Sequence, residues 1–286
     1  MVRFDEPSHT YTTDSGDQFT SVTTVIGKYK EKFDGDFWSI YKAVERVFIK
    51  ENTSTEWVKY KKMRNPKLIV KEYKDKVFTP DFLNRVDITR KLILDEWEYE
   101  RDVSCYNGTN FHKQKEDDLF SLGVDSGLTV RTALDNTGMP YDISKLPDGI
   151  YPELTLWNNY YRLAGQADIV TIFTKDGIRY VDIDDHKTNK KIDEVSFFNP
   201  KTNKYKKMLY PLSAINDCNF EHYQLQISTY AYLLESFGFN VRKLTFNHYN
   251  NIGTKDRPKY EHAKEYDLAY KKKEVVRMLT NFKSKR

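Results

Sequence analysis

Apolar residues in the first 120 positions of the chain recur mainly at the spacing of α-helices. A strand–turn–strand pattern opens the sequence at residues 9–21, and Ser21 and Asp36 are placed to cap the two helices that follow it. Further helices are predicted at residues 56–75, 81–103 and 105–120. We therefore expect the first part of the chain to be mainly helical.

From residue 150 the apolar positions alternate with polar ones, as they do in β-strands. Three strands are predicted between residues 150 and 187, and Asp176 and Gly177 form a hairpin turn between the last two. The remainder is predicted as a polar connection at 188–218, a helix at 220–236, a strand at 241–249 and a basic amphipathic C-terminal helix. This order predicts an α/β fold. We divide it into an N-terminal hairpin and helical region, residues 1–120, and a core, residues 121–286.

Composition excludes several classes of protein. Aromatic residues make up 15% of the 286 positions, which is too many for a disordered chain. Cys105 and Cys218 are too few for a disulfide scaffold or a four-cysteine metal site. No apolar run approaches the ~18 residues of a membrane span, and the polar N-terminal segment has no signal-peptide core. We expect a cytoplasmic protein without membrane partners.

Positive charge is concentrated in two stretches, although the net charge is only +4. Residues 56–78 include Lys59, Lys61 and Lys62, and residues 268–286 are also rich in lysine and arginine. Such stretches can bind phosphate groups, because they displace counterions from nucleic acid. A solvated, lysine-rich helix face produces the same pattern, so charge alone leaves both interpretations open.

The last predicted strand of the hairpin ends in an unusual combination of side chains. Val181, Ile183, Asp185 and Lys187 share one face, so a carboxylate and an amine follow two apolar residues. Pairing through the hairpin turn brings Asp168 of the preceding strand toward Asp185. Two carboxylates this close share a proton or a divalent cation, and oxygen ligands favour Mg²⁺ or Mn²⁺. Asp185 and Lys187 alone would be explained equally well by a local ion pair.

These residues resemble the D…(D/E)xK core of the PD-(D/E)XK nucleases, with Asp168 followed by Asp185-His186-Lys187. Motifs of the RecB-type branch, which includes mitochondrial genome maintenance exonucleases and phage relatives, follow in the family's order. The matching positions are the SVT segment Ser21-Val22-Thr23, the GxxxH segment Gly108 to His112, the acid Glu153, and the QxxxY segment Gln226 to Tyr230. The whole-chain pattern looks most like phage-encoded members.

The resemblance implies a restriction-endonuclease-like core, in which helices flank a mixed central sheet. It also implies a site that binds Mg²⁺ or Mn²⁺, with Lys187 positioning the attacking water. The implied metal ligands are His112, Asp168, Asp185 and the backbone carbonyl of His186, with Glu153 supporting a second ion. Gln226 and Tyr230 are implied to contact DNA phosphate or the lysine. Glu116 follows His112 by four residues on the same helix face, so we expect it to orient the His112 ring.

Several departures and ordinary explanations stand beside this resemblance. Ala167 replaces the proline of the family's name, and two cysteines exclude its iron–sulfur subgroup. No Walker A sequence is present, so we expect no use of ATP. His112 would also suit a helix surface, and Tyr230 would suit the core. Asp184 is expected on the opposite strand face, unless a one-residue bulge turns it inward.

The expected function is metal-dependent hydrolysis of DNA phosphodiester bonds, preferably by an exonuclease that acts on ends or single strands. An endonuclease or flap nuclease of the same fold is the nearest alternative. A non-catalytic DNA-binding or assembly protein on a nuclease scaffold is the alternative from another class. Expected partners are DNA and phage or host replication and recombination proteins.

Overall fold

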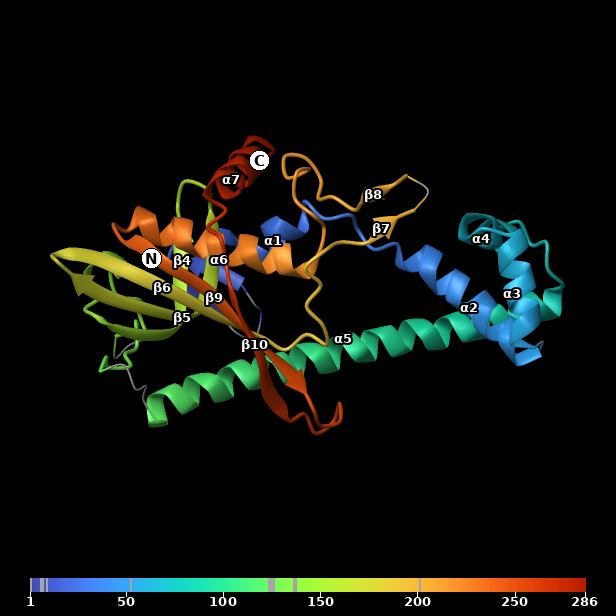
Figure 1. The fold of residues 1–286 in the computed structure, drawn as a ribbon, viewed down its shortest axis with the longest axis horizontal. Coiled ribbons are helices and arrows are strands. Elements are labelled where there is room, and N and C mark those ends of the chain that lie inside the picture. Colours follow the sequence, from blue (N-terminus) through green and yellow to red (C-terminus); the bar gives the residue numbers. More distant parts are fainter. Residues whose placement is uncertain are drawn as a thin grey trace. The chain divides into compact units, whose positions relative to one another are not determined.

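The computed structural model describes residues 2–5, 8, 10–51, 53–122, 127–135, 138–200 and 202–286. The chain forms two compact units (Figure 1), a sheet unit of residues 1–31 and 108–286 and a helical unit of residues 32–107. We predicted a division at residue 120 instead. The observed boundaries differ from it because the first strands join the central sheet and the helical segment that carries His112 belongs to the sheet unit. His9, in the first predicted strand, lies outside the described residues.

The sheet unit is built on one mixed β-sheet, with the order β1-β2-β3-β5-β6-β9-β10 and β4 paired to β5. Its strands are β1 Val2–Asp5, β2 Thr10–Thr13, β3 Gln18–Ser21, β4 Gly149–Asn158, β5 Leu163–Lys175, β6 Ile178–Lys187, β9 Asn240–Asn251 and β10 Tyr260–Asp267. β3 with β5 and β6 with β9 are parallel, whereas the other pairs are antiparallel. The structure confirms an α/β fold with a mixed central sheet.

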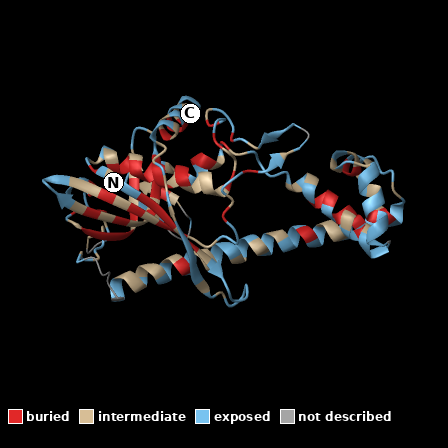
Figure 2. Ribbon diagram, in the orientation of Figure 1, coloured by how far each residue is buried: buried red, intermediate tan, exposed pale blue. Residues whose placement is uncertain are grey.

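Helices flank this sheet, and apolar side chains fill the space between the layers. The helices of the sheet unit include α1 Val22–Gly27, α6 Asn219–Ser236, α7 Lys272–Ser284 and the end of the longer helix that carries His112, with a 3₁₀ turn at Ile143–Lys145. α6 contacts β4, β5, β6 and β9, and Figure 2 shows the buried residues concentrated on α6 and the central strands. Ser21 caps α1 as predicted, because its side chain accepts a hydrogen bond from the Thr24 backbone N–H at 3.0 Å.

The helical unit contains α2 Gly35–Glu51, α3 Ser54–Met63, α4 Pro66–Lys74 and the first part of α5 Pro80–Leu122. The helix predicted at 56–75 is two helices, since Asn65 caps α4 and Pro66 occupies its first turn. Asp34 rather than Asp36 accepts the capping hydrogen bond of α2, from the Phe37 N–H at 2.9 Å. Trp57, with the fully buried Ile69, belongs to a separate apolar core in this unit.

The structure corrects two other parts of the predicted element order. The helices expected at 81–103 and 105–120 form the single 43-residue helix α5, which tolerates Gly108 in its interior. β1 and β10 were not predicted, because β10 is mostly polar and exposed and lacks the alternation that marks a half-buried strand. Among the described residues, no helix is both long and apolar enough to cross a membrane.

Candidate metal centre

The β5–β6 hairpin places the two predicted aspartates at the same end of the sheet. Ile169 pairs with Asp184, so the next positions in register are Asp168 and Asp185. Val181 and Ile183 are buried on one face of β6, and Asp185, with 1% of its side chain exposed, follows on that face. The predicted convergence of Asp168 and Asp185 follows from ordinary hairpin pairing.

The other two aspartates of β6 point away from this site, and for Asp184 this was predicted. Asp184 accepts hydrogen bonds from the Thr245 hydroxyl and the Asn247 side-chain amide, each at 2.8 Å. Asp182 forms an ion pair with Arg242. No bulge turns Asp184 inward, because the β5–β6 register is continuous from Asp184 to the turn.

His112, Glu153 and Asp168 bring ligand atoms within 4.8 Å of one another. His112 Nδ1 lies 3.1 Å from Asp168 Oδ2 and 3.8 Å from Glu153 Oε1. The residues come from α5, β4 and β5, so three separate elements contribute. An imidazole nitrogen and two carboxylates form a donor set that suits Mn²⁺ or Mg²⁺.

Glu153 has a backbone conformation that is rare for a residue other than glycine. Its φ angle is +49°, although it stands within β4 opposite Asp168, between the pairs Pro152–Ile169 and Leu154–Ala167. A left-handed conformation of this kind costs about 1–3 kcal/mol, and such strain is concentrated at functional sites. The strained backbone therefore supports a role for the Glu153 carboxylate beyond that of a charge at a strand edge.

Asp185 and Lys187 form a buried ion pair at the end of β6. Asp185 Oδ1 is fully buried and has no hydrogen-bond partner in the described part of the chain. A buried carboxylate oxygen without a partner is costly in free energy, and a bound cation would satisfy it. Asp185 therefore fits the predicted metal site, next to the cluster of His112, Glu153 and Asp168.

Tyr223 of α6 is a site residue that the sequence analysis missed. The Lys187 ammonium lies 4.8 Å from the centroid of the Tyr223 ring, and the Tyr223 hydroxyl donates a hydrogen bond to Asn189 Oδ1 at 2.5 Å. Tyr223 therefore fixes the position of the lysine from the α6 side. The sequence could have indicated this role, because Tyr223 lies three residues before Gln226 and residues three apart share a helix face.

The electrostatics of the cluster follow from burial and from the close carboxylates. Burial and the charge of Asp168 raise the pKa of Glu153 to about 8 and that of Asp185 to about 7. Burial opposes ionisation of Asp168 as well, but His112 holds its pKa down at about 2. Burial disfavours the imidazolium too, yet Asp168 raises the pKa of His112 to about 9. In the absence of a cation, protons on groups such as His112 and Glu153 therefore offset the negative charge of the carboxylates.

The pKa values of Lys187 and His186 are shifted in opposite directions. Burial lowers the pKa of Lys187, but the charge of Asp185 outweighs it and the net shift is upward, so the amine stays charged. Burial lowers the pKa of His186 to about 4, so its ring is neutral. The His186 backbone N–H donates to Asp168 Oδ2 at 2.7 Å. His186 thus orients Asp168, and its carbonyl group stays a predicted ligand.

Gln226 and Tyr230 are close to each other on α6, as their spacing predicts. Gln226 donates a hydrogen bond to the Tyr230 hydroxyl at 3.0 Å, and Tyr230 is buried. Burial and the charge of Asp185 raise the Tyr230 pKa well above its ordinary value. Gly165 of β5 gives this ring its space, because a Cβ atom there would lie 2.6 Å from Tyr230 Cε1. Tyr230 therefore belongs to the core as well as to the wall of the site.

Two further sets of predicted residues have less direct support. Glu116 lies near enough to Glu153 to raise the pKa of that carboxyl. Lys59, Lys61 and Lys62 are exposed on α3, in the helical unit. Their exposure fits either phosphate binding or a solvated helix face, so the role of these lysines stays a prediction.

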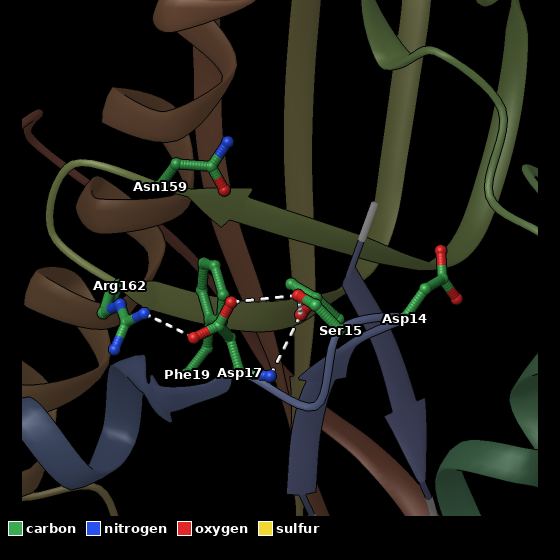
Figure 3. A pocket seen from close by; sticks show the side chains of 7 residues that line it. Asp14, Ser15, Asp17, Phe19, Asn159 and Arg162 are labelled. Atoms are coloured by element: carbon green, nitrogen blue, oxygen red, sulfur yellow. Dashed lines mark hydrogen bonds and ion pairs between the residues drawn. The ribbon is translucent and has the colours of Figure 1, made fainter.

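A separate pocket of about 510 Å³ lies beside the β2–β3 turn and the β4–β5 connection (Figure 3). Asp17 accepts hydrogen bonds there from Arg162 at 2.5 Å and from the Ser15 hydroxyl at 3.0 Å. The charge of the Asp17 carboxylate is therefore balanced by Arg162. None of the predicted site residues lines this pocket, so it is separate from the candidate metal centre.

No protein-family model matches the sequence, and no curated protein matches it.

Proposed function

We propose that the protein is a divalent-metal-dependent DNA nuclease with a restriction-endonuclease-like core and a site of the PD-(D/E)XK type. The observation that carries the proposal is the convergence of one imidazole, three carboxylates and one buried lysine from α5, β4, β5 and β6 at one end of the sheet. The same residue types, in the same chain order, gave the resemblance to that family.

Each side chain has a chemical task in this proposal. A bound Mg²⁺ or Mn²⁺ would polarise the phosphoryl oxygen and make a bound water more acidic. His112, Asp168 and Asp185 would hold the cation, with Glu153 as a further acid beside it. Lys187 stays charged next to Asp185, where it can orient the attacking water and offset negative charge that develops on the phosphate.

The decisive experiment compares Asp185→Asn with Asp184→Asn. Both residues lie on β6, but only Asp185 faces the cluster, whereas Asp184 is held by Thr245 and Asn247 on the opposite face. We expect Asp185→Asn to reduce Mg²⁺- or Mn²⁺-dependent DNA degradation at least about 100-fold, as loss of a key electrostatic group does. Asp184→Asn should retain most of the activity.

The substrates are end-labelled linear and circular DNA, each single- and double-stranded, with Mg²⁺, Mn²⁺ or EDTA. Degradation of linear but not circular DNA supports an exonuclease, and cleavage of circles supports an endonuclease. Binding without cleavage in any metal would overturn the proposal in favour of a non-catalytic DNA-binding protein. Equal activity in the two variants would remove Asp185 from the site.

A further inference from the structure

The small hairpin after β6 carries aromatic side chains that the sheet unit leaves exposed. Its strands are β7 Phe198–Asn199 and β8 Lys204–Tyr205, and Figure 2 shows most of it in pale blue. Phe197 is 71% exposed, Phe198 40% and Tyr205 47%. Phe198 and Tyr205 are directly paired across the hairpin, with ring centroids 5.1 Å apart. Phe198 and Tyr205 therefore form a contiguous exposed apolar surface, which is a feature of binding sites.

The charge of this segment indicates an anionic ligand. Between Phe197 and Tyr210 the sequence has four lysines and no acidic residue. Two of these lysines have partners, since Lys206 forms an ion pair with Asp217 at 2.9 Å and the Lys207 ammonium donates to Asn216 Oδ1 at 2.8 Å. Lys204, by contrast, is exposed on β8 next to Tyr205. An apolar protein partner would need only the exposed rings. Exposed rings next to lysines instead suit a single-stranded nucleic acid, whose bases stack on the rings and whose phosphates pair with the lysines.

The hairpin is fixed at its base to the element that lines the candidate site. The Ser196 hydroxyl donates to the Lys206 carbonyl at 2.7 Å, and the Lys206 N–H donates to the Phe197 carbonyl at 2.8 Å. Below it, Asn219 at the start of α6 donates to the Lys191 carbonyl at 2.7 Å. α6 also carries Tyr223, the neighbour of Lys187. Hydrogen bonds therefore hold the hairpin base in place, and the segments on either side of it lead to β6 and α6, which carry Lys187 and Tyr223.

We propose that the β7–β8 hairpin is a stacking platform for unpaired bases and makes single-stranded DNA the preferred substrate. The preference for a substrate rests on the proposed function, whereas the binding role does not. Base faces are covered by their neighbours inside a duplex, so the unpaired bases of single strands are the ones that can stack on Phe198 and Tyr205. Stacking tolerates any base sequence, because every base has a π-face.

The test measures DNA binding in EDTA, where no metal-dependent cleavage occurs, by fluorescence anisotropy. The probes are a labelled oligothymidylate, an abasic oligonucleotide of the same length and a blunt duplex. The variants are Phe198→Ala and Tyr205→Ala, whose rings pair across the hairpin, and Tyr141→Ala is the matched control, since Tyr141 is 48% exposed on the same unit but outside the hairpin. Melting temperatures verify that each variant is folded.

We expect each hairpin variant to bind oligothymidylate about tenfold more weakly, and to bind the abasic strand and the duplex almost as the wild type does. Tyr141→Ala should leave all three affinities unchanged. Equal loss on all three probes, or a wild type that binds the abasic strand as tightly as oligothymidylate, overturns the stacking role.

Hydrolysis of bis(p-nitrophenyl) phosphate with Mn²⁺ separates this inference from the proposed function, because that small phosphodiester has no bases. The hairpin variants should retain the wild-type rate on it. If the wild type hydrolyses no phosphodiester but the hairpin variants lose single-strand binding, the nuclease proposal fails and the platform stands. If the wild type hydrolyses DNA and the variants bind single strands normally, the platform fails and the nuclease proposal stands.

Discussion

At the scale of single residues, Asp168 organises the candidate metal centre. It accepts a hydrogen bond from the His186 N–H and lies 3.1 Å from His112 Nδ1, and its charge raises the pKa of Glu153 and of Asp185. One ionised carboxylate thus determines the protonation of its neighbours. Without a cation, His112 keeps a proton that a metal would have to displace.

This arrangement makes metal binding dependent on pH. The pKa of His112 is raised from 6.5 to about 9, so between these pH values the metal-free protein holds a proton that imidazole must lose before it binds a cation. We expect the affinity for Mn²⁺ to rise up to about tenfold per pH unit for each proton released in that window. Calorimetry in buffers of different ionisation enthalpy measures the protons released.

His112→Gln is the matched variant for this measurement. It removes the titrating group, so fewer protons should be released and the pH dependence should flatten. The stability of the metal-free fold depends on pH in the opposite direction to the affinity for metal, because it falls as the pH rises. A raised histidine pKa stabilises the fold below about pH 6.5, and that contribution is lost as the pH rises through about 9. Proton release that is unchanged in His112→Gln would exclude His112 as a ligand.

At the scale of elements, strand alternation and the hairpin turn were enough to predict the pairing of β5 with β6 and the convergence of Asp168 with Asp185. Both depend on interactions that are local in sequence. The φ of +49° at Glu153, the contact of Tyr223 with Lys187 and the space at Gly165 could not be predicted, because each depends on how distant elements pack. For the same reason, the polar connection at 188–218 gave no sign of the β7–β8 hairpin.

The packing of α6 against β5 gives a prediction of its own. A Cβ atom at Gly165 would lie 2.6 Å from Tyr230 Cε1 and 3.0 Å from Val22 Cγ2, and Tyr230 is too buried to move freely. We expect Gly165→Ala to lower the free energy of unfolding by about 1–3 kcal/mol, as overpacking of a core does. Thermal and urea denaturation measure the change.

Gly108→Ala is the control, because this glycine lies within α5 and an added Cβ atom would have no neighbour within 4 Å. Alanine in a helix interior is more stable than glycine by up to about 1 kcal/mol, so this variant should be more stable than the wild type. The two glycine substitutions should therefore have opposite signs. Unchanged stability in Gly165→Ala would show that β5 and α6 do not pack this closely.

At the scale of the whole molecule, the two larger apolar cores of the described residues lie between the sheet and α6 and within the helical unit, and a smaller cluster joins Val2, Tyr11 and Ala164. The candidate metal ligands all belong to the sheet unit, whereas Lys59, Lys61 and Lys62 belong to the helical unit. The residues of the proposed chemistry and those of the predicted phosphate binding thus belong to different units, and they can be substituted separately.

The last prediction concerns those three lysines. If they contact DNA phosphates, replacing all three with alanine should weaken binding of single strands and reduce the slope of log affinity against log salt by roughly 2, since each contact contributes about 0.7. Thermal stability should change little, because the side chains are exposed. Glu56→Ala, which removes an exposed acid from the same helix α3, should strengthen binding instead. An unchanged salt slope in the triple variant would leave these lysines as an ordinary solvated helix face, and the basic hairpin and C-terminal helix would then carry the phosphate contacts.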